Sequence, residues 1–177
     1  MKLLPDTLTI IQKFIQTRVK EAGAKGVVLG LSGGIDSATT LALAVSSIGS
    51  ENVKGLIMPF KESESISLAT QHANSLNVNV KKYNISSIVD NYKEVSDSYS
   101  SKASEGNLHS RIRMSLLYGE AFSSNHLVIG TSNKSELLVG YYTKWGDGAS
   151  DLLPMGDLYK SQVYALARSL DVPTKIL

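Results

Sequence analysis

The stretch GVVLGLSGGIDSA, residues 26–38, decides the fold of this chain. Its first six residues are glycine or aliphatic, which is typical of a buried strand in a parallel sheet. Residues 35–48 are rich in alanine and leucine and predict a helix that ends at Gly49. A glycine turn between such a strand and such a helix points backbone N–H groups, and the positive end of the helix dipole, at one spot. This turn is therefore predicted to bind an anion.

Outward from this stretch, helices and strands alternate along the chain. Apolar residues at spacings of three and four predict further helices over residues 6–22, 66–76, 106–124 and 160–170. Short apolar or alternating runs predict further strands over residues 53–59, 78–83 and 126–130. Such alternation predicts an α/β fold, a doubly wound parallel sheet with helices on both faces, in one domain over residues 1–177. Ligands of such sheets bind at the carboxyl ends of the strands.

The composition excludes several classes of protein. The chain has 177 residues, of which 42% are hydrophobic and 19% charged, and its formal net charge of +2 is too small to indicate a nucleic-acid partner. It contains no cysteine, which excludes disulfides, thiolate zinc sites and cysteine nucleophiles. No window approaches the ~20 apolar residues of a membrane span, and the N-terminus does not resemble a signal peptide. We therefore expect a cytoplasmic protein without a membrane partner.

The glycine turn is neither of the two common nucleotide-binding loops. The sequence contains no G-x-x-x-x-G-K-[ST] and no G-x-G-x-x-G. Ser32 and Ser37 supply hydroxyl donors, and Asp36 places a carboxylate beside the expected anion. A carboxylate next to phosphates is costly unless a cation lies between them, so Asp36 implies Mg²⁺. The alternative is a Gly-Gly turn that serine and aspartate merely cap.

Residues 31–38 resemble the signature of the pyrophosphate-loop ATPases, which cleave ATP between its α- and β-phosphates. That superfamily includes NAD synthetases, GMP synthetases and tRNA-thiolating enzymes, which this octet does not separate. Three later segments resemble NAD synthetase signatures: GTSNKSEL at 130–137, YYTKWGDGASD at 141–151 and PMGDLYK at 154–160. NLHSRIRM at 107–114 matches the segment upstream of them, and the resemblance covers about residues 6–177.

Resemblance to the NAD synthetases implies a Rossmann-like fold and a reaction in two steps. ATP adenylylates the nicotinate carboxylate of deamido-NAD (nicotinic acid adenine dinucleotide), and pyrophosphate leaves with Mg²⁺. Ammonia then displaces AMP from the mixed anhydride and gives NAD. ATP is thus the co-substrate, and the absence of cysteine favours ammonia over glutamine as the direct nitrogen donor. The family also pairs as homodimers, and the amphipathic helices at 6–22 and 106–124 fit such pairing.

The resemblance also assigns site residues. The expected ATP contacts are Gly30, Leu31, Ser32, Gly33, Gly34, Ile35, Asp36, Ser37, Thr131 and Lys160. Asp36 and Glu136 are the expected Mg²⁺ ligands, because Glu136 lies one turn into a helix that begins near a strand end. Lys160 is expected to act in catalysis by neutralising charge on the departing pyrophosphate. The expected deamido-NAD contacts are Arg111, Lys144 and Asp151. Asp147 is expected to attract ammonium and help to deprotonate it.

Other interpretations are open at this point. Glu136 also fits a solvated first helical turn, Lys144 and Asp151 fit plain loop charges, and the aromatic residues at 141, 142 and 145 fit core packing. The whole chain also fits another pyrophosphate-loop ligase, GMP synthetase-like or tRNA-modifying, or a non-catalytic ATP-binding fragment. The resembled family continues past the helix of Lys160, so residues 171–177 are expected to lead into a further element and the chain to lack a C-terminal segment. We therefore expect this chain to bind ATP with Mg²⁺ but to show weak or absent NAD synthesis.

Overall fold

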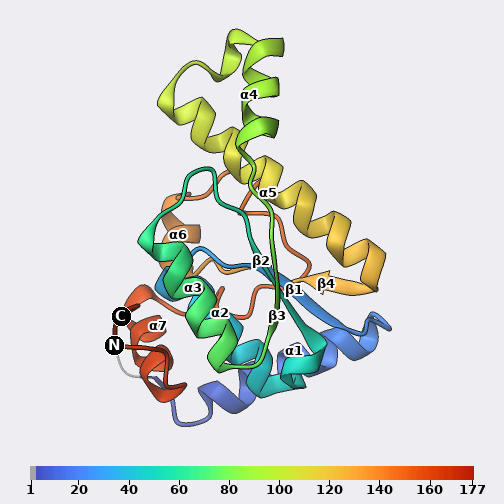
Figure 1. The fold of residues 1–177 in the computed structure, drawn as a ribbon. Coiled ribbons are helices and arrows are strands. Elements are labelled where there is room, and N and C mark those ends of the chain that lie inside the picture. The colour runs from blue at the N-terminus through green and yellow to red at the C-terminus, as the bar shows by residue number, and fades with distance from the viewer. Residues whose placement is uncertain (1–2) are drawn as a thin grey trace.

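The computed structural model describes residues 3–177 and contains a parallel sheet of four strands. The strands are β1 (Gly26–Gly30), β2 (Val53–Ile57), β3 (Asn79–Lys82) and β4 (His126–Val128). Their order in the sheet is β3-β2-β1-β4, so the chain moves outward from β1 to β3 and then returns to add β4 on the other side of β1 (Figure 1). All four predicted strands are confirmed.

The α-helices of the described residues include every helix that the apolar spacing predicts. They are α1 (Thr7–Glu21), α2 (Ile35–Ile48), α3 (Glu64–Ser75), α4 (Ser86–Val95), α5 (Lys102–Ser124), α6 (Lys134–Val139) and α7 (Lys160–Ser169). Short 3-10 helices cover Ser50–Asn52 and Asp97–Tyr99. None of the helices within residues 3–177 combines the length and the apolar character needed to cross a membrane.

The structure differs from the predicted elements in the region between β3 and α5. The prediction omits α4, although Ile88, Tyr92 and Val95 are spaced as on one face of a helix. The long helix α5 begins at Lys102, earlier than the predicted residue 106, because Ser101 caps it. The Ser101 hydroxyl accepts the Ser104 N–H over 3.1 Å and so satisfies a backbone donor of the first turn.

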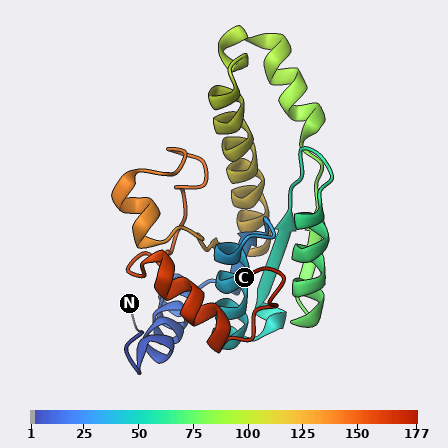
Figure 2. The same ribbon diagram turned by 90° about the vertical axis from the view of Figure 1, so that its left-hand side faces the viewer.

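Helices cover both faces of the sheet, which confirms the doubly wound class. Side chains alternate along β1, so Val27 and Leu29 point into one core and Val28 points into the other. The first core is completed by α1, α2, α3 and α7, and the second by α4 and α5. Figures 1 and 2 show that α4 and the first half of α5 extend beyond the edge of this layered body.

The neighbouring strands β1 and β4 form the point at which the direction of winding changes. The chain leaves β1 through α2 on one face, and it reaches β4 through α5 on the other face. Because no helix crosses directly between these two strands, a crevice opens at their carboxyl ends. The glycine turn after β1 and the segment after β4 both lie there.

Candidate active site

The turn between β1 and α2 requires glycine at position 33. Gly33 has a φ of 82°, in the left-handed region that side chains rarely adopt. A Cβ at this position would lie 2.1 Å from the carbonyl oxygen of Ser65, so the turn is pressed against the start of α3. The positive φ of Gly33 and its close contact with the Ser65 backbone therefore together exclude any other residue at this position.

Two serine hydroxyls hold this turn in one conformation. Ser37 Oγ donates to the Gly34 carbonyl oxygen at 3.0 Å and accepts the Ser32 N–H at 3.2 Å. Because the only hydroxyl proton of Ser37 is used in this way, Ser32 Oγ donates to Ser37 Oγ over 3.0 Å and accepts the Gly34 N–H at 3.2 Å. The Ser32 and Ser37 hydroxyls, which the sequence predicts to donate to an anion, thus form hydrogen bonds within the turn.

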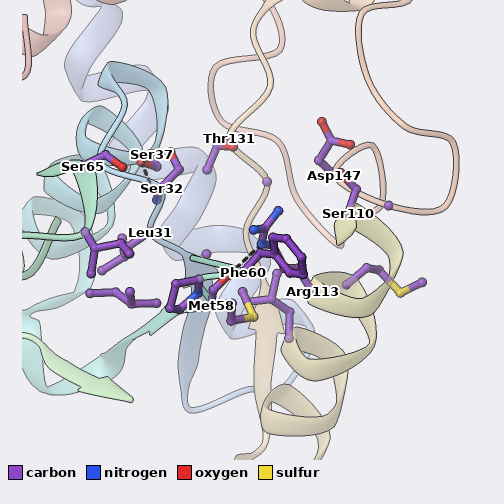
Figure 3. Close-up of a pocket in the computed structure, with 18 of the residues that line it drawn as sticks. Leu31, Ser32, Ser37, Met58, Phe60, Ser65, Ser110, Arg113, Thr131 and Asp147 are labelled. Atoms are coloured by element: carbon purple, nitrogen blue, oxygen red, sulfur yellow. Dashed lines mark hydrogen bonds between the residues drawn. The ribbon is translucent and has the colours of Figure 1, made fainter. Parts of the chain in front are cut away.

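A cleft of about 530 Å³ opens beside this turn. Its size falls within the range of about 300–1,000 Å³ that is usual for small-molecule sites. Its walls come from the ends of β1, β2 and β4, the start of α3, one face of α5 and the loop around residue 147. Figure 3 shows Ser32, Ser37 and Ser65 on one side of the cleft and Ser110 and Asp147 on the other.

Two carboxylates and one ammonium group meet next to the turn. Asp36 lies in the first turn of α2, Glu136 in α6 and Lys160 at the first position of α7. The Lys160 ammonium contacts Asp36 Oδ2, and its nitrogen is 3.8 Å from Glu136 Oε1. Both carboxylates therefore lie near one cation. One or two carboxylates are the usual protein contribution to a Mg²⁺ ion that also binds substrate phosphates.

Asn133 links these two carboxylates. It is the N-cap of α6, where its Oδ1 accepts the Glu136 N–H and Glu136 Oε2 accepts the Asn133 N–H, both at 3.2 Å. Its Nδ2 donates to Asp36 Oδ1 at 3.0 Å. The capping box thus directs Glu136 Oε2 to the start of its own helix, whereas Oε1 is the oxygen nearer to Lys160.

A second cationic group, Arg113 on α5, lies in the cleft wall. Its Nε donates to the carbonyl oxygen of Met58 at 2.9 Å, which ties α5 to the end of β2. Burial lowers the pKa of the Arg113 guanidinium from its ordinary value, while the charge of Asp147 acts in the opposite direction. Arg113 and Asp147 both line the cleft, so this guanidinium lies within the electrostatic influence of the Asp147 carboxylate.

The loop between α6 and α7 brings Asp147 to the cleft. Asp147 Oδ1 accepts the Thr143 N–H at 2.8 Å, and Thr143 Oγ1 donates to Asn107 Oδ1 on α5 at 2.7 Å. These contacts hold the loop against the helix that carries Arg113. The aromatic residues of the loop are exposed, Tyr141 by 79% and Trp145 by 67%, so the interpretation of this loop's aromatics as core residues is wrong.

The remaining predicted contacts, Arg111, Lys144 and Asp151, are not among the residues that line the cleft. Arg111 Nε donates to the carbonyl oxygen of Lys144 at 3.3 Å, and the Lys144 ammonium lies 5.5 Å from the centre of the Trp145 ring. Asp151 is turned to the sheet, where Oδ2 accepts the Val128 N–H at 2.7 Å. Arg111 is therefore joined to the backbone of Lys144, whereas Asp151 is hydrogen-bonded to β4.

Known proteins are similar to this chain in sequence and in fold. A sequence model described as NAD synthase matches residues 7–177. This chain belongs to the NAD synthase family. An NH3-dependent NAD(+) synthetase of Thermococcus sibiricus is 48% identical over 170 residues, which cover 96% of this chain and 67% of that protein. The chain thus spans about two thirds of the length of the curated relatives that it matches.

Two solved structures of related proteins superpose closely on this chain. An NH3-dependent NAD synthetase from Campylobacter jejuni superposes with a TM-score of 0.93 at 43% identity, covering 97% of this chain and 75% of that one. An NMN synthetase from Francisella tularensis superposes with a TM-score of 0.91 at 34% identity, covering 97% of this chain and 72% of that one. The four-stranded α/β fold described above is therefore the fold of the NAD synthase family.

The structure of this NAD synthase family member brings the predicted site residues together only in part. The predicted ATP contacts that line the cleft are Gly30, Leu31, Ser32, Ser37 and Thr131. Asp36 and Lys160 meet Glu136 next to it, whereas the side chain of Ile35 is buried in the first core. The cleft residues that the sequence analysis did not single out include Met58, Phe60, Ser65, Ser110 and Arg113. Only the position of Arg113, two residues after Arg111 in a matched segment, could have drawn attention to it.

Proposed function

We propose that this chain supplies the ATP-binding and adenylylating part of an ammonia-dependent NAD synthetase. Its reaction converts deamido-NAD, ATP and ammonia to NAD, AMP and pyrophosphate. The observation that carries the proposal is the meeting of Asp36, Glu136 and Lys160 beside an anion-binding turn and a cleft of nucleotide size. Three charged groups from α2, α6 and α7 have no structural need to converge, but they suit a triphosphate with a metal ion.

The phosphate end of ATP is assigned to the glycine turn and the three charged groups. Asp36 Oδ2 and Glu136 Oε1 are the oxygens that would hold Mg²⁺, since both already face one cation. The ion would supply charge neutralisation on the pyrophosphate that leaves. Lys160 would then interact with the same phosphates, because its ammonium would no longer be needed between the carboxylates.

The acceptor, deamido-NAD, is assigned to the basic residues in and near the other side of the cleft. In the first step a carboxylate oxygen of the acceptor bonds to the α-phosphorus of ATP, and the bond from that phosphorus to pyrophosphate breaks. Arg113 in the cleft wall, and Arg111 with Lys144 beyond the loop, suit the carboxylate and phosphates of such an acceptor.

Ammonium, the source of the nitrogen, is proposed to bind near the Asp147 carboxylate. A carboxylate that lines the cleft attracts ammonium and accepts a proton from it. The nitrogen then bonds to the carbonyl carbon of the mixed anhydride, and AMP leaves with the electron pair. The absence of cysteine supports free ammonia as the donor, since the chain has no thiol with which to hydrolyse glutamine.

A mass-spectrometric assay with ¹⁵N-ammonium tests the reaction. All ¹⁵N-labelled NAD that forms from ATP, Mg²⁺ and deamido-NAD, even at a low rate, is expected to be matched by an equal amount of AMP. Parallel arms contain nicotinic acid mononucleotide or xanthosine monophosphate as acceptors, and glutamine with an ammonium scavenger as donor. AMP release with another acceptor only would overturn the choice of substrate. ATP binding without AMP release in any arm would favour a non-catalytic ATP-binding fragment.

A further inference from the structure

Asn133 makes more contacts with the charged residues of the site than the start of a helix requires. The residue is fully buried, and its backbone and side chain together make three hydrogen bonds to Asp36 and Glu136. Two of these form the capping box of α6. The third joins Asn133 to Asp36, which is 97 residues away in the sequence.

Two of these hydrogen bonds divide each carboxylate into an oxygen held by Asn133 and an oxygen that faces Lys160. Asn133 holds Asp36 through Oδ1 and Glu136 through Oε2. The other oxygens, Asp36 Oδ2 and Glu136 Oε1, are those that face the Lys160 ammonium. A carboxylate fixed in this way cannot rotate to present its second oxygen elsewhere, so its direction is set before a ligand arrives.

We propose that Asn133 is the positioning residue of this site, which presents one oxygen of each carboxylate to a single divalent cation. This inference rests on the metal site of the proposed function. Asn133 itself does not touch the ion or the substrate. It acts through Asp36 and Glu136, and it makes α2 and α6 one unit at the mouth of the cleft.

The need for asparagine follows from the hydrogen-bond inventory. Serine, aspartate and asparagine cap helices about equally well, so the start of α6 alone does not select among them. Of the three, only asparagine combines an acceptor for the Glu136 N–H with an N–H donor for Asp36 that cannot rotate away from it. An aspartate here would instead place a third carboxylate against Asp36, at the cost of repulsion between like charges.

The test compares Asn133→Ser with the unaltered chain. Serine keeps an acceptor for the Glu136 N–H but removes the donor to Asp36, so the folded state is expected to keep nearly its full stability. Mn²⁺ affinity is measured by electron paramagnetic resonance in the presence of α,β-methylene-ATP, which cannot be cleaved at the reacting bond. Calorimetry measures the affinity for the same nucleotide without metal. We expect Mn²⁺ to bind about 10- to 100-fold more weakly, with the metal-free nucleotide affinity unchanged.

Three further variants distinguish an error in the proposed metal site from an error in the positioning role of Asn133. Asp36→Asn and Glu136→Gln are expected to weaken Mn²⁺ binding, whereas Ser101→Ala, which removes the cap of α5, is expected to lower only the unfolding temperature. If the unaltered chain binds no Mn²⁺, or if the two carboxylate variants bind it normally, the metal site is wrong and the role of Asn133 falls with it. If only the carboxylate variants lose Mn²⁺ and Asn133→Ser keeps it, the metal site stands and the positioning role is overturned.

Discussion

Lys160 at the start of α7 and Asp36 at the start of α2 form an ion pair across 124 residues of sequence. The same ammonium lies 3.8 Å from Glu136 Oε1. Without a metal ion, Lys160 therefore relieves the repulsion between two carboxylates that face each other. The divalent cation proposed for these oxygens would displace this ammonium, so Lys160 and the metal would compete for the same pair of ligands.

The first prediction concerns this competition. Lys160→Met removes the ammonium, so nucleotide-free Mn²⁺ is expected to bind about two- to five-fold more tightly, since a partly exposed ion pair is worth up to about 1 kcal/mol. Turnover is expected to fall, because Lys160 is also assigned to the phosphates. Mn²⁺ titration by electron paramagnetic resonance measures the affinity. Lys134→Met serves as the control, since Lys134 lies on α6 and pairs only loosely with the exposed Asp157, at 3.7 Å. Weaker metal binding in Lys160→Met would contradict the competition.

The second prediction concerns Asp36 itself. Asp36→Ala is expected to lower NAD formation by about 100-fold or more, because charge on the leaving pyrophosphate is no longer neutralised through the metal. Initial rates at saturating ATP and Mg²⁺ provide the measurement. Asp157→Ala, which removes a fully exposed carboxylate near α7, is expected to leave the rate unchanged. Normal turnover in Asp36→Ala would rule out its assignment as a metal ligand.

The third prediction concerns the cation in the cleft wall. Arg113→Gln keeps a polar side chain but removes the charge, and it is expected to weaken nucleotide or acceptor binding about 10- to 100-fold, the usual effect of losing a charged hydrogen bond. The loss is expected to shrink at high salt. Arg18→Gln, on the exposed face of α1, is the matched control, because the contacts of Arg18 with Glu21 and with the Phe14 ring lie within its own helix. Equal affinities of the two variants for ATP and for deamido-NAD would show that Arg113 has only a structural role.

The fourth prediction is a dependence of stability on pH. His72 is buried, donates from Nε2 to the Ala38 carbonyl oxygen at 3.1 Å and, among the described residues, has no partner at Nδ1. Burial lowers the pKa of His72 from its ordinary value of 6.5. As the pH falls below about 6.5, the unfolded chain therefore binds a proton first and the folded state loses stability, by up to about 1.4 kcal/mol per pH unit.

Urea denaturation from about pH 8 to about pH 5 measures this slope. His72→Gln, which keeps a donor for Ala38, is expected to flatten the slope without removing it. Burial and the charge of Arg113 also lower the pKa of His109, so that residue contributes in the same direction. An unchanged slope in His72→Gln would show that the pH dependence has another source.

The fifth prediction is a homodimer. Ile10 on α1 and Phe122 on α5 are 63% and 93% exposed, and they lie on the two helices that the sequence analysis assigns to pairing. Light scattering at micromolar concentration is expected to give twice the mass of one chain. The double variant Ile10→Ser, Phe122→Ser is expected to shift the protein toward monomer, because a two-fold interface loses each contact twice. Val95→Ser, on the projecting helix α4, is the exposed control. A monomeric unaltered chain would contradict the assignment.

Local sequence patterns were sufficient to predict the sheet, the strand–turn–helix unit and most helices. A buried strand shows as a run of aliphatic residues, and Gly33 shows where the backbone must turn and lie against a neighbour. The capping box of α6 could also have been read from Asn133 and Glu136, three residues apart. These features depend on residues that are close in sequence, so the sequence by itself determines them.

Only the tertiary structure decided which side chains share one site. Asp151 stays a predicted substrate contact, and only the structure shows that its carboxylate accepts the Val128 N–H of β4 and the Tyr118 hydroxyl of α5. Arg113 carried no local signal that it would face the cleft while Arg111 turned to the loop. The contacts of Asp36 with Asn133 and Lys160 depend on how α6 and α7 pack across α2 after long excursions of the chain. Local periodicity records which face of an element is buried, but the partner of a polar side chain is set by whichever distant group the packing brings within hydrogen-bond distance.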